Sequence, residues 1–147
     1  MPFRFTLAPL FRLRQSIERQ RTVKLQEANL HVSRAQEKLA QLERSLSDSA
    51  QSDATALQSG RTGAELQFAS VLRENLHLFR QELQSDILKL ELLRRRALGE
   101  YHQAYREREV LETLRARERR VYQQEQLRRQ QQELDATCLL QRWHRRD

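Results

Sequence analysis

Apolar residues recur at heptad spacing through the first third of the chain. Between residues 25 and 46 the steps alternate between three and four without interruption, through Leu25, Ala28, Val32, Ala35, Leu39, Leu42 and Leu46. This spacing lines one face of a helix and is typical of a coiled-coil seam. Upstream the repeat loosens where Arg21 falls on the stripe. We predict a first helix that begins near residue 8, because Pro9 suits the first turn of a helix.

The end of this first helix has two expected positions. Small polar residues fill positions 47–53, which favours an end near residue 50. Leu57 nevertheless keeps the heptad spacing, so an extension to residue 58 is the second expectation. Gly60 and Gly63 then break the pattern. The connection is expected over about residues 51–62.

A second, longer helix is expected over about residues 63–137. Its start carries the capping-box pattern Thr62-Gly63-Ala64-Glu65, in which the Thr hydroxyl and the Glu carboxylate satisfy each other's backbone N–H groups. The expected seam comprises Phe68 or Ala69, Leu72, Leu76, Phe79, Leu83, Ile87, Leu90, Leu93, Ala97, Tyr101, Ala104, Arg108, Leu111 and Leu114. Beyond Tyr122 a glutamine-rich stretch keeps its helix propensity but lacks a seam.

Two seams and one break predict an all-α fold: a single antiparallel coiled-coil hairpin over residues 1–147 with a longer second helix. If Leu46 faces Leu66, Phe11 lies beside Tyr101. If the first helix reaches Leu57, the pairing shifts by about eleven residues, or three helical turns. In either register the second helix extends roughly thirty residues past the first. A weakly apolar helix of that length is marginal alone in water, so we expect it to need a partner.

Composition and charge narrow the class of protein. The net charge is +7, and the chain has 27 Lys and Arg against 20 acidic residues. The bases gather toward both ends of the chain and are almost all Arg, which suits the binding of an acidic partner. A single cysteine, Cys138, indicates a reducing compartment. We find neither the apolar core of a signal peptide nor a membrane-spanning run, so a soluble, cytoplasmic protein is expected.

Residues that could carry chemistry are sparse. His31, His77, His102 and His144 are scattered, without other ligands at metal-binding spacing. The chain has no glycine-rich phosphate loop and no nucleophile motif. We therefore expect no enzyme activity, no cofactor, no metal and no small-molecule substrate. Nucleic acid is not an expected partner either, because acidic residues interrupt the basic ones.

Three features of the sequence could bind proteins. The first is the aromatic, basic N-terminus around Phe3, Phe5 and Arg12; it either packs on the second helix near Tyr101 or Tyr105, or binds a partner. The second is an apolar stripe that Val71 and Leu78 widen beyond what one helix covers; its main residues are Phe68, Leu72, Leu76 and Phe79. The third is a pair of arginine clusters, formed by Arg94, Arg95 and Arg96 and by Arg115, Arg117, Arg119 and Arg120. A solvated helix face is the alternative for about half of these arginines.

Motifs at both ends of the chain carry a family resemblance. The opening Phe3-x-Phe5-x-Leu7-x-x-Leu10-x-x-Leu13-Arg14 resembles the start of the flagellar FliJ family. The later runs also resemble that family: Leu111-Glu112-x-Leu114-x-x-Arg117, Tyr122-x-x-Glu125 and Gln132-Glu133-x-Asp135. The chain departs from the pattern at Ala136, where many members carry a second acid. The resemblance covers nearly the whole length.

The resemblance implies a role in flagellar type III protein export. It implies a stalk that inserts the terminal end of the hairpin into the export ATPase ring, promotes ring assembly, and couples the ring to the membrane export gate and to export chaperones. It also implies a cytoplasmic location at the inner face of the membrane. The stripe at Phe68, Leu72, Leu76 and Phe79 is then expected to bind the gate. The residues expected to contact the ring are Phe3, Phe5, Arg12, Arg14, Arg115, Arg117, Arg119 and Arg120.

Other functions stay open at this point. The related YscO-type stalks of virulence injectisomes share the expected shape and much of the logic. A basic coiled-coil arm for nucleic acid is a different class, motivated by the pI of about 10.4. A self-assembling coiled coil is a third class, and interruptions such as Arg21 oppose a long zipper of identical helices.

Overall fold

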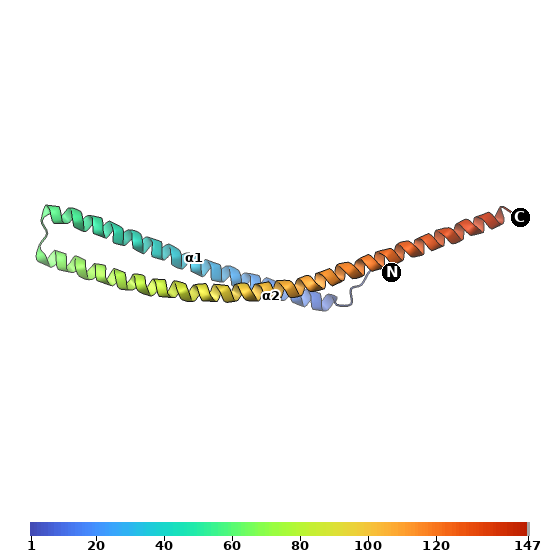
Figure 1. The fold of residues 1–147 in the computed structure, drawn as a ribbon, viewed down its shortest axis with the longest axis horizontal. Coiled ribbons are helices and arrows are strands. Elements are labelled where there is room, and N and C mark those ends of the chain that lie inside the picture. Colours follow the sequence, from blue (N-terminus) through green and yellow to red (C-terminus); the bar gives the residue numbers. More distant parts are fainter. Residues whose placement is uncertain (147) are drawn as a thin grey trace. The chain divides into compact units, whose positions relative to one another are not determined.

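The chain folds into two α-helices in a computed structural model that describes residues 1–146. Helix α1 spans Ala8–Ser59 and helix α2 spans Gly63–His144, and the described residues contain no strand. The helices pack against each other, and α2 is the longer of the two (Figure 1). The predicted all-α hairpin is therefore confirmed.

The connection between the helices is shorter than expected and covers only residues 60–62. Gly60 ends α1 with a φ of 82°, a left-handed conformation that suits glycine after a helix. The predicted capping box at Thr62 is confirmed. The Glu65 N–H donates to the Thr62 hydroxyl at 3.4 Å, and the Thr62 N–H donates to the Glu65 carboxylate at 3.4 Å.

Helix α1 continues through the polar stretch at residues 47–53, so the expected end near residue 50 was wrong. The Thr55 hydroxyl donates to the Gln51 carbonyl one turn earlier, so its hydrogen bond is satisfied within the helix. Asp53 accepts hydrogen bonds from Arg61, at 2.9 Å, and from Arg73. Polar side chains that are satisfied in this way allow the helix to continue to Ser59.

The contacts divide the chain into two compact units. The turn unit comprises residues 20–101, and the terminal unit comprises Met1–Arg19 together with the chain from His102 onward. Within the turn unit α1 and α2 run antiparallel from the connection (Figure 1). Its buried residues are Val32, Ala35 and Leu42 on α1 and Leu83 on α2. The heptad seam of α1 is thus where the spacing predicts it.

The seam of α2 differs from the expected one at three positions in the turn unit. Each has an apolar residue followed by arginine, and the arginine takes the seam position: Arg73, Arg80 and Arg94 are half-buried. Their neighbours Leu72, Phe79 and Leu93 are 47%, 54% and 54% exposed, so assigning these three to the seam was wrong. With the arginines in place, steps of three and four continue unbroken along α2, as a straight seam requires.

Carboxylates explain how arginine can occupy a seam. The aliphatic part of its side chain covers the apolar surface, while the guanidinium group reaches an acid at the edge. Arg73 pairs with Asp53, Arg80 lies 3.3 Å from Glu43, and Arg94 lies 2.8 Å from Glu91. Periodicity of apolar residues alone does not predict this arrangement.

Ion pairs fix the register of the hairpin. In the turn unit Arg21 donates to Glu100 at 2.6 Å, and in the terminal unit Arg14 pairs with Glu107. Phe11 belongs to the same buried cluster as Leu111, about ten residues beyond Tyr101. This is the register expected when α1 is long. The alternative that places Phe11 beside Tyr101 is wrong, because the connection is short.

Helix α2 ends at His144, beyond the expected end near residue 137. No glycine or proline interrupts residues 123–144, and glutamine and arginine favour helix. Arg142 and His144 in the last turn suit the negative end of the helix dipole. Every side chain in residues 127–146 is exposed, so this stretch has no packing partner within the described chain.

Candidate protein-binding surfaces

An aromatic cluster holds the N-terminus on α2 in the terminal unit. Phe5, Phe11 and Leu111 are buried together, and Phe3, Leu7, Ala8 and Leu114 pack against them. The Phe3 and Tyr122 rings lie 5.6 Å apart, and the Tyr122 hydroxyl donates to the Met1 carbonyl. Packing of the N-terminus on α2 is therefore confirmed. The expected location at Tyr101 or Tyr105 was wrong, because the register shift brings Leu111 and Tyr122 there instead.

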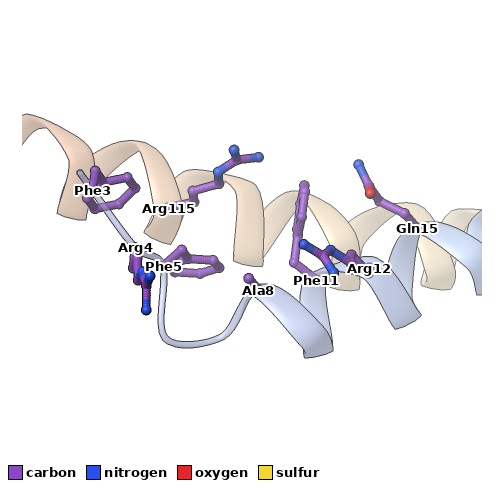
Figure 2. A pocket seen from close by; sticks show the side chains of 8 residues that line it. All are labelled: Phe3, Arg4, Phe5, Ala8, Phe11, Arg12, Gln15 and Arg115. Atoms are coloured by element: carbon purple, nitrogen blue, oxygen red, sulfur yellow. The ribbon is translucent and has the colours of Figure 1, made fainter.

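The aromatic cluster forms one wall of an open pocket of about 460 Å³ (Figure 2). Three elements contribute to it: the N-terminal segment, the first two turns of α1, and α2 at Arg115. The lining residues are Phe3, Arg4, Phe5, Ala8, Phe11, Arg12, Gln15 and Arg115. Three of them are arginines and none is acidic. Arg115 is held over the Phe11 ring, with its guanidinium carbon 5.5 Å from the ring centre.

The other expected ring-contacting residues lie apart from this pocket. Arg14 pairs with Glu107 on α2 and is half-buried. Arg117 and Arg120 line a second open hollow of about 460 Å³, together with Glu109 and Glu112. Arg119 is exposed. Of the residues expected to contact the ring, the pocket therefore brings together Phe3, Phe5, Arg12 and Arg115. The other four, Arg14, Arg117, Arg119 and Arg120, do not line it.

Arginines in the terminal unit fall into paired and unpaired groups. Arg108 contacts both Glu18 and Glu112. Burial lowers the pKa of Arg108, but attraction to Glu18 and Glu112 outweighs this, and the net pKa is raised above its ordinary value. In contrast, Arg4, Arg12, Arg115, Arg117, Arg119 and Arg120 form no ion pair within residues 1–146. The seam arginines are therefore structural, and the outer ones are available to a partner.

The turn unit presents an apolar stripe on the outside of α2. Phe68 is 72% exposed, and its neighbours on the same flank are Val71, Leu72, Leu78 and Phe79, all about half exposed. Leu76, which was expected in this stripe, is half-buried in the seam. Phe68 and Leu72 also line an open pocket of about 620 Å³ beside Asp53 and Arg61 at the connection.

Sequence reasoning missed Gln15 in the terminal pocket and misplaced two residues of the apolar stripe. Gln15 lines the terminal pocket, and its position four residues after Phe11 on one helix face was the available signal. Leu72 and Phe79 were named in the apolar stripe, but they were also assigned to the seam of α2, from which the structure excludes them. The signal was the seven-residue spacing of Arg73 and Arg80, which places both at one heptad position.

Neither a cluster of possible metal ligands nor a membrane-spanning helix is found in the described part of the chain. Within residues 1–146 no group of three or more His, Cys, Asp and Glu lies close enough to hold a metal ion. No helix in that range has an apolar stretch long enough to cross a membrane. Cys138 is a free, exposed thiol.

The chain is thus of the class of two-helix coiled-coil hairpins, with an exposed apolar stripe in one unit and, within residues 1–146, arginines without an ion pair in the other. The family model described as flagellar FliJ protein matches residues 3–147. The chain therefore belongs to the flagellar FliJ family and is a protein of the flagellar export apparatus that interacts with components of that apparatus. Searches of curated proteins and of solved structures found no match.

Proposed function

We propose that this chain is the adaptor between the export ATPase and the membrane export gate. The terminal unit enters the ATPase ring and promotes its assembly, and the turn unit binds the gate. One observation carries the proposal: the two exposed surfaces differ in chemistry, one being cationic and the other apolar. Two unlike surfaces on one chain suit two unlike partners.

The cationic terminal unit supports insertion into a ring. Arginines without an ion pair in residues 1–146 project from it, among them Arg115, Arg117 and Arg119, and an excess of positive charge steers a protein toward an acidic lumen. Helix α2 also continues past the aromatic cluster as an exposed helix with no partner in the described chain. A ring would supply that partner and cover its exposed leucines, Leu127 and Leu134.

Charge reversal tests ring insertion. Changing Arg117, Arg119 and Arg120 to Glu should abolish stimulation of the ATPase and leave the residual binding less sensitive to salt, because the attraction is replaced by repulsion. The measurement is the ATPase rate against adaptor concentration at two ionic strengths. Reversal of Arg34, Arg44 and Arg95, which are exposed in the turn unit, is the matched control. Equal stimulation by the parent and the terminal variant at both ionic strengths contradicts insertion.

The apolar stripe supports gate binding. Exposed Phe68, Leu72 and Phe79 make little contact with α1, so a partner can bury them at no expense to the hairpin. Burying three such side chains removes enough apolar area to anchor an interface. The expected partner surface is an apolar groove on the cytoplasmic part of the gate, which would place the adaptor at the inner face of the membrane.

Alanine substitution tests gate binding. Phe68→Ala with Leu72→Ala should weaken binding to the purified gate domain by at least about tenfold, and helicity measured by circular dichroism should be unchanged. Val23→Ala with Leu30→Ala is the control, because both residues are exposed apolar residues of α1 in the same unit. Equal affinity of the stripe variant and the control variant would show that the stripe is not the gate site.

Export chaperones are the third partner class in the proposal. Their binding surface is tested by a pull-down from cytoplasm with the parent chain, the stripe variant and the terminal charge-reversal variant. Loss of a chaperone with only one of the two variants assigns it to that unit. If neither the parent chain nor a variant captures a chaperone, chaperones are not partners and the proposed function loses this part.

A further inference from the structure

The terminal pocket combines two features that single out its ligand. Phe3, Phe5 and Phe11 form an apolar wall, and Arg4, Arg12 and Arg115 surround it (Figure 2). Apolar walls favour an aliphatic or aromatic side chain, whereas guanidinium groups favour carboxylates. A ligand that satisfies both has an apolar residue next to acidic ones.

The charge around the pocket is uncompensated. Arg4, Arg12 and Arg115 make no ion pair within the described chain, and no Asp or Glu lines the pocket. Two other arginines of the same unit are neutralised: Arg14 pairs with Glu107, and Arg108 contacts Glu18 and Glu112. Three unpaired arginines at one hollow therefore favour acidic groups of a ligand there.

The pocket is also held in shape before a ligand arrives. Phe5 and Phe11 are buried at 8% and 6% exposure, and the Phe5 carbonyl accepts a hydrogen bond from the Ala8 N–H at 3.2 Å. The Phe11 ring positions the Arg115 guanidinium group above it. A wall of this kind loses little conformational freedom on binding, which favours affinity for a short segment.

We propose that this pocket binds an acidic peptide segment, with one apolar side chain against its aromatic lining and flanking carboxylates on Arg12 and Arg115. The volume of about 460 Å³ suits one side chain and its neighbouring backbone. A nucleic acid fits less well, because strand binding uses several exposed aromatic faces in a row, and of the three rings in this pocket only Phe3 is not buried. The inference rests on the proposed function, since it names the kind of segment in the ATPase ring that the terminal unit contacts.

The probe is a short fluorescent peptide with a central phenylalanine between runs of Asp and Glu, and binding to the full chain is followed by fluorescence anisotropy. Two comparison peptides change one feature each: serine replaces the phenylalanine, or Asn and Gln replace the acids. An oligonucleotide of equal charge is the fourth probe. The parent chain should bind the first peptide at least about tenfold more tightly than the other three probes, because only that peptide offers both the apolar and the acidic group.

Protein variants locate the binding. Arg12→Gln with Arg115→Gln should weaken binding of the acidic peptide about tenfold, and Arg19→Gln should not, because Arg19 is exposed on α1 outside the pocket. The near-identical helicity of these variants is checked by circular dichroism. The proposal is overturned if the serine peptide or the oligonucleotide binds as well as the acidic phenylalanine peptide. Equal affinity of the double variant and the Arg19 variant also overturns it.

Ring insertion and pocket binding can fail separately. The Arg117, Arg119 and Arg120 reversal tests insertion and leaves all eight lining residues of the pocket in place. Stimulation that is lost in that variant while peptide binding stays at the parental affinity supports both statements. Peptide binding that is absent from the parent chain, with ring stimulation intact, overturns the pocket alone.

Discussion

The turn unit and the terminal unit differ in the residues that fill their interiors and in the surfaces they present. In the turn unit Arg73, Arg80 and Arg94 occupy the seam, and the apolar residues beside them face outward. In the terminal unit Phe5 and Phe11 fill the interior beside the paired Arg108, and the three arginines at the pocket form no ion pair within residues 1–146. The candidate binding surfaces therefore differ: an apolar stripe lies in the turn unit, and a pocket lined by three arginines lies in the terminal unit. The position of each residue in the heptad, more than composition, decides the surface chemistry.

Different arginines contribute to the stability of the hairpin and to the proposed binding of partners. Arginines that pair with acids across the seam stabilise the hairpin modestly, because exposed pairs contribute on the order of 0–1 kcal/mol each. Unpaired arginines and exposed aromatic residues contribute little to folding and are free to bind. Substitutions can therefore test the folding and the binding of each unit with little overlap.

The largest expected effect is on the terminal unit. Phe11→Ala removes a buried ring from a small cluster and should destabilise that unit by about 3 kcal/mol. Hydrogen exchange should show faster exchange of α2 amides near Leu111, with amides near Leu83 unchanged. Phe68→Ala, at a 72% exposed position of the turn unit, is the control and should change neither. Equal loss of protection in both units would show that they do not unfold separately.

The second effect concerns the carboxylate at the connection. Asp53→Ala leaves Arg61 and Arg73 without their shared partner, whose side chain is only 15% exposed. The expected loss in the free energy of unfolding is about 1–2 kcal/mol, reduced by the partial exposure of both arginines. Urea denaturation measures it. Asp48→Ala, at an exposed position of the same helix, should be neutral, and a neutral Asp53→Ala would mean that these pairs do not support the connection.

The third effect should be stabilising. Arg80 lies in the seam with its Nε buried and unbonded, and its ion pair with Glu43 is 39% and 47% exposed on the two sides. Arg80→Leu should raise the free energy of unfolding by about 1 kcal/mol, because apolar packing replaces a weak pair. Thermal unfolding is the measurement, and Arg95→Leu on the exposed face is the control without gain. A lower stability for Arg80→Leu would show that the arginine is preferred in this seam.

The smallest effect separates the connection from the seams. Gly60 has a φ of 82°, so Gly60→Ala should cost about 1 kcal/mol although the added methyl group meets no atom within 4 Å. Gly99→Ala, in the interior of α2 and equally unobstructed, should stabilise by about 0.5–1 kcal/mol. Melting temperatures of the two variants should move in opposite directions. Movement in the same direction would contradict the conformational explanation.

Local patterns in the sequence determined much of the fold. The heptad spacing from Leu25 to Leu46 and the capping box at Thr62 depend on neighbours within a few residues, and the structure contains both. The aromatic N-terminus was also visible as an element that packs or binds. Such features follow from helix geometry alone, so they can be read without knowing what lies opposite.

Only the tertiary structure decided the register, the seam of α2 and the pocket. Asp53 stabilises the end of α1 through Arg73, which lies twenty residues away, and the short connection that results pairs Phe11 with Leu111. The choice between Leu72 and Arg73 for the seam, and between Phe79 and Arg80, depends on acids brought close by that register. A periodic pattern of apolar residues assigns those residues to the interior. It carries no information on a carboxylate across the hairpin, which makes arginine more favourable at the seam position.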